Sequence, residues 1–424
     1  MKPKLYILFV IVLGLILCAC ESAPDRNQQA PAKISPDISI TSATTDDSTE
    51  APDVTAPVSN SSNEIVYSTL KEEKERVKSL AGKNLYGFNL PARISMPDAD
   101  DLCLFEVSCS YDHSYDEILE CIKGLWADYE AANELELQCN DFDYTDQPKF
   151  KVRLWFDENR KYIFKCSTMG TIVFNSIDDS WQSYTSTTKK YDILWGDQIS
   201  DDEGYDLLGG YMSVNDAVKM VEDKFNTFYS AVEQNEFTYK VQQLSVATNS
   251  VSGTPDYYMI LGREYTGIPI DTCMLYYNLS DTRLEKALFG ESILVIVHEK
   301  DKIACIDTYF DARNLYKGES IDKIVSFDSA LNLAKKEIAT IGLENIEQAG
   351  LCYYHVQDAI YDNKGFLISG KVGMDENERT PLRPYWLFAQ KKTTDNFKIT
   401  PNGHGTTILV DALDGTVYYF ETTA

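Results

Sequence analysis

The catalytic chemistry open to this chain depends first on four histidines, His113, His298, His355 and His404. None stands in a His-x-x-x-His or Glu-x-x-His pattern, which excludes a helix-borne zinc site. His404 lies in the flexible sequence Asn-Gly-His-Gly, where an imidazole could serve a nucleophile, but the chain has no Gly-x-Ser-x-Gly elbow. We therefore predict no catalytic residue. A surface hydrolase that uses His404 or paired carboxylates remains an alternative.

Carboxylates are abundant, with 66 Asp and Glu residues in the chain. Asp141, Asp143 and Asp146 superficially resemble the start of a calcium-binding loop. Such a loop requires glycine at its sixth position and a bidentate glutamate at its twelfth, where this chain has Asp146 and Val152. We expect neither a metal site nor a cofactor.

Paired aromatic residues are the main candidates for binding. Adjacent residues of a strand point to opposite faces, so each pair would place one ring inward and one outward. The structural interpretation is half-buried strand tyrosine, and the functional one is an aromatic platform for a peptide or glycan. The candidate platform residues are Tyr257, Tyr258, Tyr276, Tyr277, Tyr353, Tyr354, Tyr385, Trp386, Tyr418 and Tyr419.

The elements that would position these rings form a repeated pattern. Ser213 and Ser326 each stand as a hydroxyl N-cap before a helix with apolar periodicity, and strand-like runs follow each helix. Ser114 begins a third segment with the same helix-start pattern. We therefore predict an α+β fold of two or three units, each with an N-terminal helix packed on an antiparallel sheet. The predicted strands include 102–109, 150–156, 162–166, 171–174, 239–246, 257–262, 272–277, 293–298, 351–356, 365–372, 385–390 and 406–410.

The last segment, Pro384-Tyr385-Trp386 followed by Asp411-Ala412-Leu-Asp-Gly415, resembles the end of a PepSY-type unit. In that family an aromatic strand precedes a final hairpin whose turn is built on Asp-Ala-x-x-Gly. The arrangement is also similar to YycH/YycI-like extracytoplasmic regulators, which join such units in series. The resemblance implies a non-catalytic protein that inhibits, escorts or modulates a peptidase or sensor. It covers residues 213–424 and weakens toward the N-terminus.

The N-terminus carries an export signal. Lys2 and Lys4 precede an uncharged run of residues 5–20, which is shorter than the roughly 20 apolar residues that span a bilayer. The run ends in Leu17-Cys18-Ala19-Cys20, which resembles the lipobox of bacterial lipoproteins. The resemblance implies cleavage before Cys20 and a lipid anchor on it; Cys18 is the weaker acceptor because Leu17 is large. The protein is thus expected on the outer face of the bacterial cell membrane.

A tether and a folded part follow the signal. Residues 21–63 hold no aromatic residue, eight Ser, five Thr and five Pro, so they cannot bury enough apolar area to fold. The other eight cysteines favour disulfides by their even number, yet Cys103 and Cys166 lie on apolar strand faces as buried thiols would. The predicted ranges are 1–19 signal peptide, 20–63 tether, 64–206 N-terminal α+β domain, 207–317 first PepSY-like unit and 318–424 second PepSY-like unit.

Composition limits the partners. The net charge of −27 argues against nucleic acid and anionic lipid head groups as ligands. We predict a lipid-anchored, non-enzymatic envelope protein that binds or regulates an extracytoplasmic protein partner, with exposed strands or sheet edges available for β-addition. The alternative is a solute- or glycan-binding lipoprotein with a pocket lined by the tyrosine pairs.

Overall fold

We describe a computed structural model of the chain, in which residues Ser62–Ala424 form one compact unit. The structure describes residues 65–108, 138–143, 151–156, 162–167, 172–176, 184–229, 237–265, 267–270, 286–289, 292–309, 314–340, 345–358, 379–390 and 406–421. The predicted signal peptide and tether, the Ser114 helix and the strands 272–277 and 365–372 lie outside these residues.

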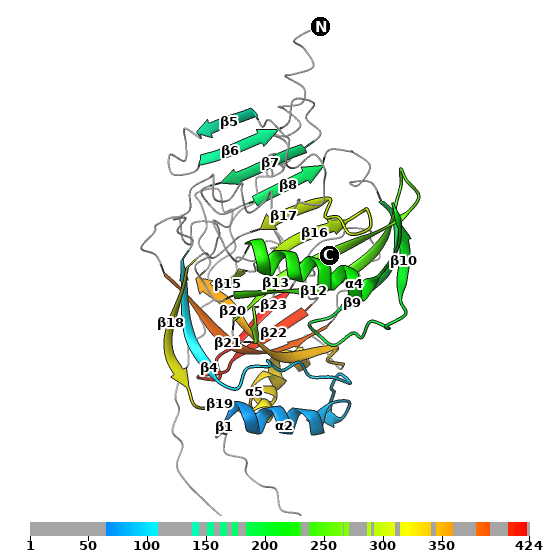
Figure 1. The fold of residues 1–424 in the computed structure, drawn as a ribbon. Coiled ribbons are helices and arrows are strands. Elements are labelled where there is room, and N and C mark those ends of the chain that lie inside the picture. Colours follow the sequence, from blue (N-terminus) through cyan, green and yellow to red (C-terminus); the bar gives the residue numbers. More distant parts are fainter. Residues whose placement is uncertain are drawn as a thin grey trace, which may run out of the picture. The chain divides into compact units, whose positions relative to one another are not determined.

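The larger sheet is antiparallel and runs in the order β5-β6-β7-β8-β17-β16-β13-β12-β9, with β14 beside β13 (Figure 1). Its longest strands, β12 and β13, pair from Phe237↔Tyr265 to Thr248↔Pro255. The bounds are β5 Gln138–Asp143, β6 Lys151–Phe156, β7 Tyr162–Ser167, β8 Ile172–Ser176, β9 Tyr184–Asp192, β12 Phe237–Asn249, β13 Pro255–Tyr265, β14 Ile268–Pro269, β16 Ser292–Val297 and β17 Cys305–Tyr309.

The second sheet runs β15-β20-β21-β22-β23, and β4 joins it by pairing with both β21 and β18. Its bounds are β4 Leu102–Ser108, β15 Lys286–Phe289, β18 Asn314–Ile321, β20 Gln348–Asp358, β21 Thr380–Ala389, β22 Thr406–Asp411 and β23 Val417–Glu421. Three two-stranded ribbons complete the described strands: β1 Tyr67–Ser68 with β19 Ile324–Val325, β2 Asn84–Leu85 with β3 Phe88–Asn89, and β10 Gly204–Leu207 with β11 Gly210–Ser213.

The described helices are short and capped as the sequence indicates. α2 (Leu70–Leu80) begins with a complete capping box between Thr69 and Glu72. α4 (Val214–Lys224) begins at the predicted N-cap Ser213 and continues into a π-helical turn, Phe225–Tyr229. α5 (Phe327–Thr340) follows the predicted Ser326, whose hydroxyl accepts a hydrogen bond from the Ser329 amide at 3.3 Å. Both predicted helix starts are thus confirmed.

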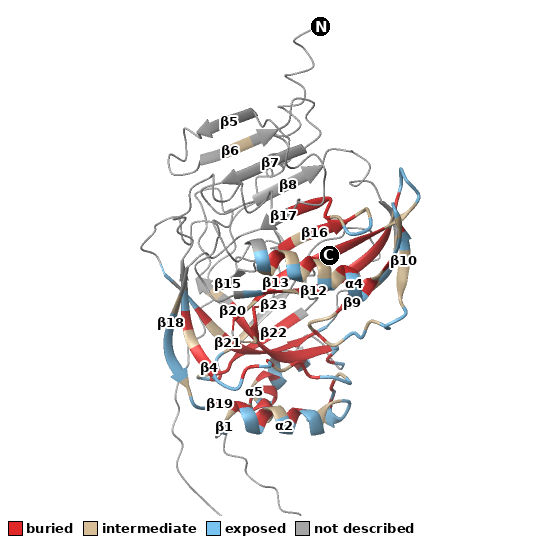
Figure 2. Cartoon of the chain, viewed as in Figure 1, coloured by how far each residue is buried: buried red, intermediate tan, exposed pale blue. Residues whose placement is uncertain are grey.

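Each sheet buries one face under a helix. α4 packs on β12 and β13 over a core that includes Val221, Tyr239 and Tyr257, and α5 packs on β21, β22 and β23 over a core that includes Phe327 and Trp386. The Trp386 indole donates a hydrogen bond to the Val325 carbonyl at 2.7 Å. The opposite faces are buried as well, because Tyr258 and Ile296 on one sheet and Tyr354 and Leu387 on the other lie in separate apolar clusters. Figure 2 shows buried residues along the strands of both sheets.

The predicted α+β architecture of separate helix-on-sheet units is wrong. The described residues are mainly strand, with only α2, α4, α5 and the π-helical turn as helices. The sheets also draw strands from distant parts of the chain. β8 of the predicted N-terminal domain pairs with β17 of the predicted first unit, and β4 pairs with β21 of the predicted second unit. The protein is therefore a predominantly β fold of several sheets. The prediction was wrong because local periodicity identifies strands and does not select their partners.

Candidate functional site

The predicted tyrosine platform is not exposed in the three pairs whose side chains the structure describes completely. In three pairs both rings are buried: Tyr257 and Tyr258, Tyr353 and Tyr354, and Tyr385 and Trp386. The rings alternate between the two faces of each sheet as expected, but both faces are covered, so the prediction of an outward ring is wrong for these pairs. Tyr354, Tyr385 and the half-buried Tyr418 stack edge to face in one row. Tyr276, Tyr277 and the side chain of Tyr419 lie outside the described part.

The other sequence candidates are placed as follows. His298 lies after β16 with its Nδ1 2.7 Å from Oδ1 of the fully buried Asp256, whose other oxygen accepts a hydrogen bond from Asn249 at 3.0 Å. Asp141 and Asp143 belong to β5, paired with β6. Within the described ranges no group of three or more His, Cys, Asp or Glu residues could hold a metal ion. His113 and His404 lie outside these ranges.

The cysteine positions support the prediction of buried thiols for one residue. Cys103 is a buried thiol on β4, and Cys305 and Cys352 are buried in β17 and β20. Cys166 and the remaining cysteines have no described side chains, so disulfide pairing elsewhere stays a prediction.

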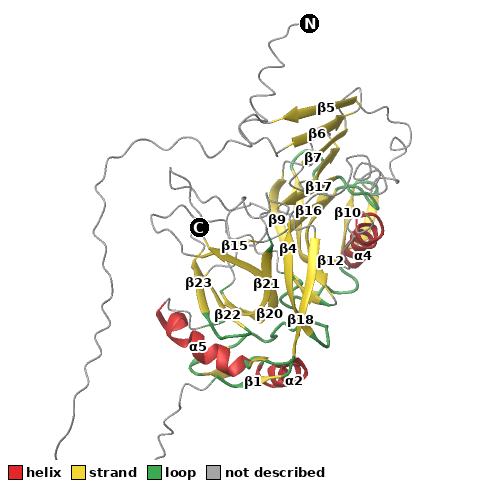
Figure 3. Ribbon diagram, turned by 90° about the vertical axis from the view of Figure 1, so that its left-hand side faces the viewer, coloured by secondary structure: helices red, strands yellow, loops and turns green. Residues whose placement is uncertain are grey.

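A cleft of about 430 Å³ lies between α2 and the extended segment 92–98. The α2 wall presents Lys74, Val77, Lys78 and Ala81, which recur at the spacing of a single helix face. α2 itself is fixed by Glu73, whose carboxylate accepts hydrogen bonds from the Ser68 hydroxyl at 2.5 Å and from the Phe327 amide at 2.8 Å. The helix is therefore anchored to the start of α5; both helices lie side by side in two perpendicular views (Figures 1 and 3).

The second wall is anchored at its middle and at its last residue. The amide of Ser95 donates to the Ala349 carbonyl at 2.8 Å, and the Ser95 carbonyl accepts from the Leu351 amide at 3.0 Å, so the segment is held along β20. The Asp98 amide donates to the Gly267 carbonyl at 2.9 Å. Backbone hydrogen bonds thus hold this wall in place.

The cleft combines an apolar floor with a basic rim. Val77 and Ile94 are buried at 1% and 7% exposure, and Met96 and Pro97 add further apolar surface. Lys74, Lys78 and Arg93 contribute three positive charges and Asp98 one negative charge, so the lining carries 3 − 1 = +2. A cleft of this volume accommodates a few side chains of a ligand. Its chemistry suits a segment that is partly apolar and partly anionic.

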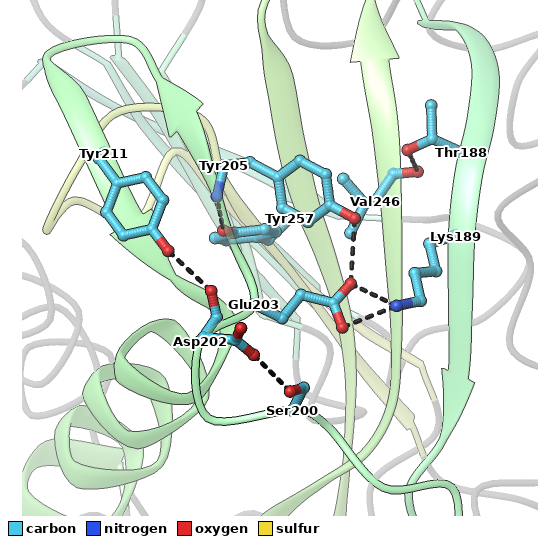
Figure 4. A network of polar contacts seen from close by, with 9 residues as sticks. All are labelled: Thr188, Lys189, Ser200, Asp202, Glu203, Tyr205, Tyr211, Val246 and Tyr257. Carbon is cyan, nitrogen blue, oxygen red and sulfur yellow. Dashed lines mark hydrogen bonds and ion pairs between the residues drawn. The ribbon is translucent and has the colours of Figure 1, made fainter.

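A separate polar network joins the β10–β11 ribbon to the larger sheet (Figure 4). Lys189 contacts both carboxylate oxygens of Glu203 at 2.6 and 2.7 Å, and the Tyr205 hydroxyl donates to Glu203 at 3.1 Å. Tyr257 donates to the Met212 carbonyl at 2.7 Å and accepts from the Tyr205 amide at 3.1 Å. Burial acts to raise the pKa of Glu203, but its hydrogen bonds, led by Lys189, lower it overall. The network holds the ribbon on the sheet.

The predicted Asp-Ala-x-x-Gly turn is confirmed between β22 and β23. The Gly415 amide donates to the Asp411 carbonyl at 2.9 Å, and Gly415 adopts the positive φ of 79° that glycine tolerates. The Asp411 side chain accepts from the Leu413 amide at 2.8 Å and lies 3.1 Å from Arg383. Burial raises the pKa of Asp411 to about 6 although Arg383 opposes the rise.

Asp411 should make the protein more stable at low pH. A carboxyl whose pKa rises from 3.8 to about 6 on folding contributes stability that is complete below 3.8 and lost as the pH climbs through 6. The difference between these two pKa values corresponds to at most about 3 kcal/mol in the free energy of unfolding. Asp411→Asn keeps the acceptor for Leu413, so its stability relative to the wild type should improve between pH 4 and pH 7.5. Urea midpoints across this range measure the difference, and parallel profiles for the two proteins would refute the assignment.

The cleft beside α2 was not predicted from the sequence. The spacing of Lys74, Val77, Lys78 and Ala81 was the available signal. The opposite wall depends on a bridge between Ser95 and Gly350, which are 255 positions apart, and no local pattern indicates that contact.

No helix in the described ranges has the length and apolar character needed to cross a membrane. No protein-family profile matches the chain, and no curated protein matches it. The fold is similar to the crystal structure of an uncharacterized protein from Eubacterium rectale, with a TM-score of 0.51 and 11% sequence identity. That likeness covers 80% of this chain and 92% of the other, and at this identity it relates the two proteins by fold alone.

Proposed function

We propose that the protein is an exported, lipid-anchored and non-enzymatic envelope protein that binds an extracytoplasmic protein partner, of peptidase or sensor type, through the cleft between α2 and residues 92–98. The observation that carries the proposal is the cleft itself, which is lined by the buried Val77 and Ile94 and by the cations Lys74, Lys78 and Arg93. α2 begins seven residues after the predicted tether ends at residue 63 (70 − 63), so the cleft lies early in the folded part.

The glycan-binding alternative loses its main support. It required the tyrosine pairs to line a pocket, and the three fully described pairs are buried in apolar clusters on both faces of their sheets. The cleft of α2 contains no residue of those pairs.

Site-specific crosslinking in intact cells tests the proposal. A photoreactive residue at Ala92, which is exposed on the cleft, should capture a protein partner. The matched control is Val251, 69% exposed in the turn between β12 and β13. A partner captured at Ala92 and absent at Val251 supports the proposal. Equal capture at both positions, or none at Ala92, overturns it.

The anchor has its own test. Cys20→Ser should abolish incorporation of a labelled fatty acid and move the protein from the membrane pellet to the soluble fraction, because Cys20 is the predicted acceptor. Cys18→Ser is the matched control and should keep both label and sedimentation. Label that persists in Cys20→Ser, or disappears in Cys18→Ser, contradicts the assignment.

A further inference from the structure

We propose that the segment held in the α2 cleft carries a carboxylate beside an apolar side chain, and that Arg93 binds this carboxylate. The inference rests on the proposed function and specifies the chemistry of the partner: an acidic peptide segment with an adjoining aliphatic or aromatic residue. It follows from the charge of the lining, the position of Arg93 and the character of the floor.

The cleft is a basic site on an acidic protein. Residues 64–424 hold 35 Lys and Arg against 59 Asp and Glu, a net charge of 35 − 59 = −24, whereas the lining carries +2. A positive concavity within a negative surface attracts anionic groups locally and repels acidic partners elsewhere. The placement therefore favours one orientation of an acidic partner segment.

The three lining cations differ in their contacts within the protein. Lys78 already pairs with Glu75 at 2.8 Å, and the Lys74 ammonium donates to the Ala99 carbonyl. Among the described residues no carboxylate lies within ion-pair distance of Arg93. A guanidinium presents a planar set of donors that matches a carboxylate with two parallel hydrogen bonds. A ligand carboxylate would supply the missing partner.

The aliphatic stem of Arg93 packs on Gly196. A Cβ at Gly196 would lie 2.4 Å from the Cδ of Arg93, so the stem of the arginine lies directly over this glycine. Gly196 also has a φ of +110°, which disfavours other residues. The stem is thereby packed while the side chain as a whole stays exposed. This packing reduces the conformational entropy that the arginine loses when it binds a ligand.

The floor specifies the second part of the ligand. Val77, Ile94 and Pro97 are buried and contribute apolar surface below the rim. Burying an apolar ligand side chain against them is favourable in proportion to the area removed from water. A lipid head group offers the anion without such a side chain, and the charge of −24 on the folded part repels an anionic membrane. The observations therefore favour a peptide.

Peptide binding tests the inference with the full-length chain in detergent micelles. The probes are two fluorescent nonapeptide libraries with a fixed central pair, Glu-Leu in one and Gln-Leu in the other, and random uncharged flanks. The Glu-Leu library should bind about tenfold or more tightly than the Gln-Leu library by fluorescence anisotropy. Arg93→Gln should remove that preference, and Arg93→Lys should keep part of it. Lys300→Gln, exposed beside the β10–β11 ribbon, is the neutral control.

A variant that is expected to bind more tightly makes the test independent of folding defects, because misfolding would only weaken binding. Glu75→Gln removes the exposed partner of Lys78 and should tighten binding of the Glu-Leu library about twofold to threefold. Equal binding of the two libraries, absence of binding, or an unchanged preference in Arg93→Gln overturns the inference. Arg93-dependent binding to phosphatidylglycerol vesicles without peptide binding also overturns it, in favour of a lipid.

The two proposals fail separately. A partner that crosslinks at Ala92 while the libraries show no carboxylate preference leaves the proposed function standing and refutes the acidic segment. Failure to crosslink at Ala92 refutes the proposed function whatever the libraries show.

Discussion

Gly350→Ala should destabilise the protein by about 3 kcal/mol and disorganise the cleft at the same time. A Cβ at this position would lie 2.5 Å from the Ser95 carbonyl oxygen, 2.8 Å from the Ser95 Cβ and 2.9 Å from the Trp195 ring. The Ser95 backbone cannot retreat without breaking its two hydrogen bonds to β20. Because Ser95 lies within the 92–98 wall, a displaced backbone should also move Arg93.

Urea unfolding measures the stability part of this prediction, and the peptide libraries measure the effect on the cleft. Gly253→Ala is the matched control, since Gly253 has a positive φ of 71° but no atom within 4 Å of an added Cβ. Gly253→Ala should lower the free energy of unfolding by about 1 kcal/mol, which is the cost of the backbone conformation alone. If Gly350→Ala proves no more damaging than Gly253→Ala, the close approach of Ser95 to β20 is wrong.

Glu73→Ala should cost about 3 kcal/mol, because Glu73 is a buried carboxylate with two partners on other elements. The Phe327 amide at the first turn of α5 and the Ser68 hydroxyl would lose their acceptor. The Phe327 residue is fully buried, so water cannot replace the lost bond without rearrangement. The negative charge also lies at the N-terminal end of α5, where the helix dipole favours it.

Two comparisons separate these contributions. Glu73→Gln keeps an oxygen acceptor without the charge and should lose roughly half as much stability. Glu75→Ala, with the glutamate side chain 72% exposed, should change the urea midpoint little. A Glu73→Ala protein as stable as Glu75→Ala would mean that α2 is not fastened to α5 through this carboxylate.

Local signals in the sequence predicted individual elements well. The hydroxyl caps Ser213 and Ser326 begin helices, the strand with Cys103 and Phe105 on one face is β4, and the Asp411 turn joins β22 to β23. These features depend on neighbours within a few residues. The residues around each feature were therefore sufficient to predict it.

Pairing between distant strands was not predictable in the same way. An amphipathic strand such as β8 fits many partners, and its pairing with β17 depends on how the whole sheet closes. The buried tyrosine pairs have the same cause. Tyr353 lies in the apolar cluster that includes Phe327 of α5, and Tyr354 lies in a separate apolar cluster, so the second face is covered too. The cleft was missed because one of its walls is positioned by the contact between Ser95 and Gly350.

The pairing of β4 and β1 has a consequence for how the chain acquires its structure. β1 pairs with β19 and β4 pairs with β18 and β21, so these two strands have their described partners only among residues 314–389. Contacts of such large sequence separation make folding slow and expose unpaired strand edges until they form. β1 and β4 must therefore wait for nearly the whole chain before they pair, and their edges stay open to aggregation until then.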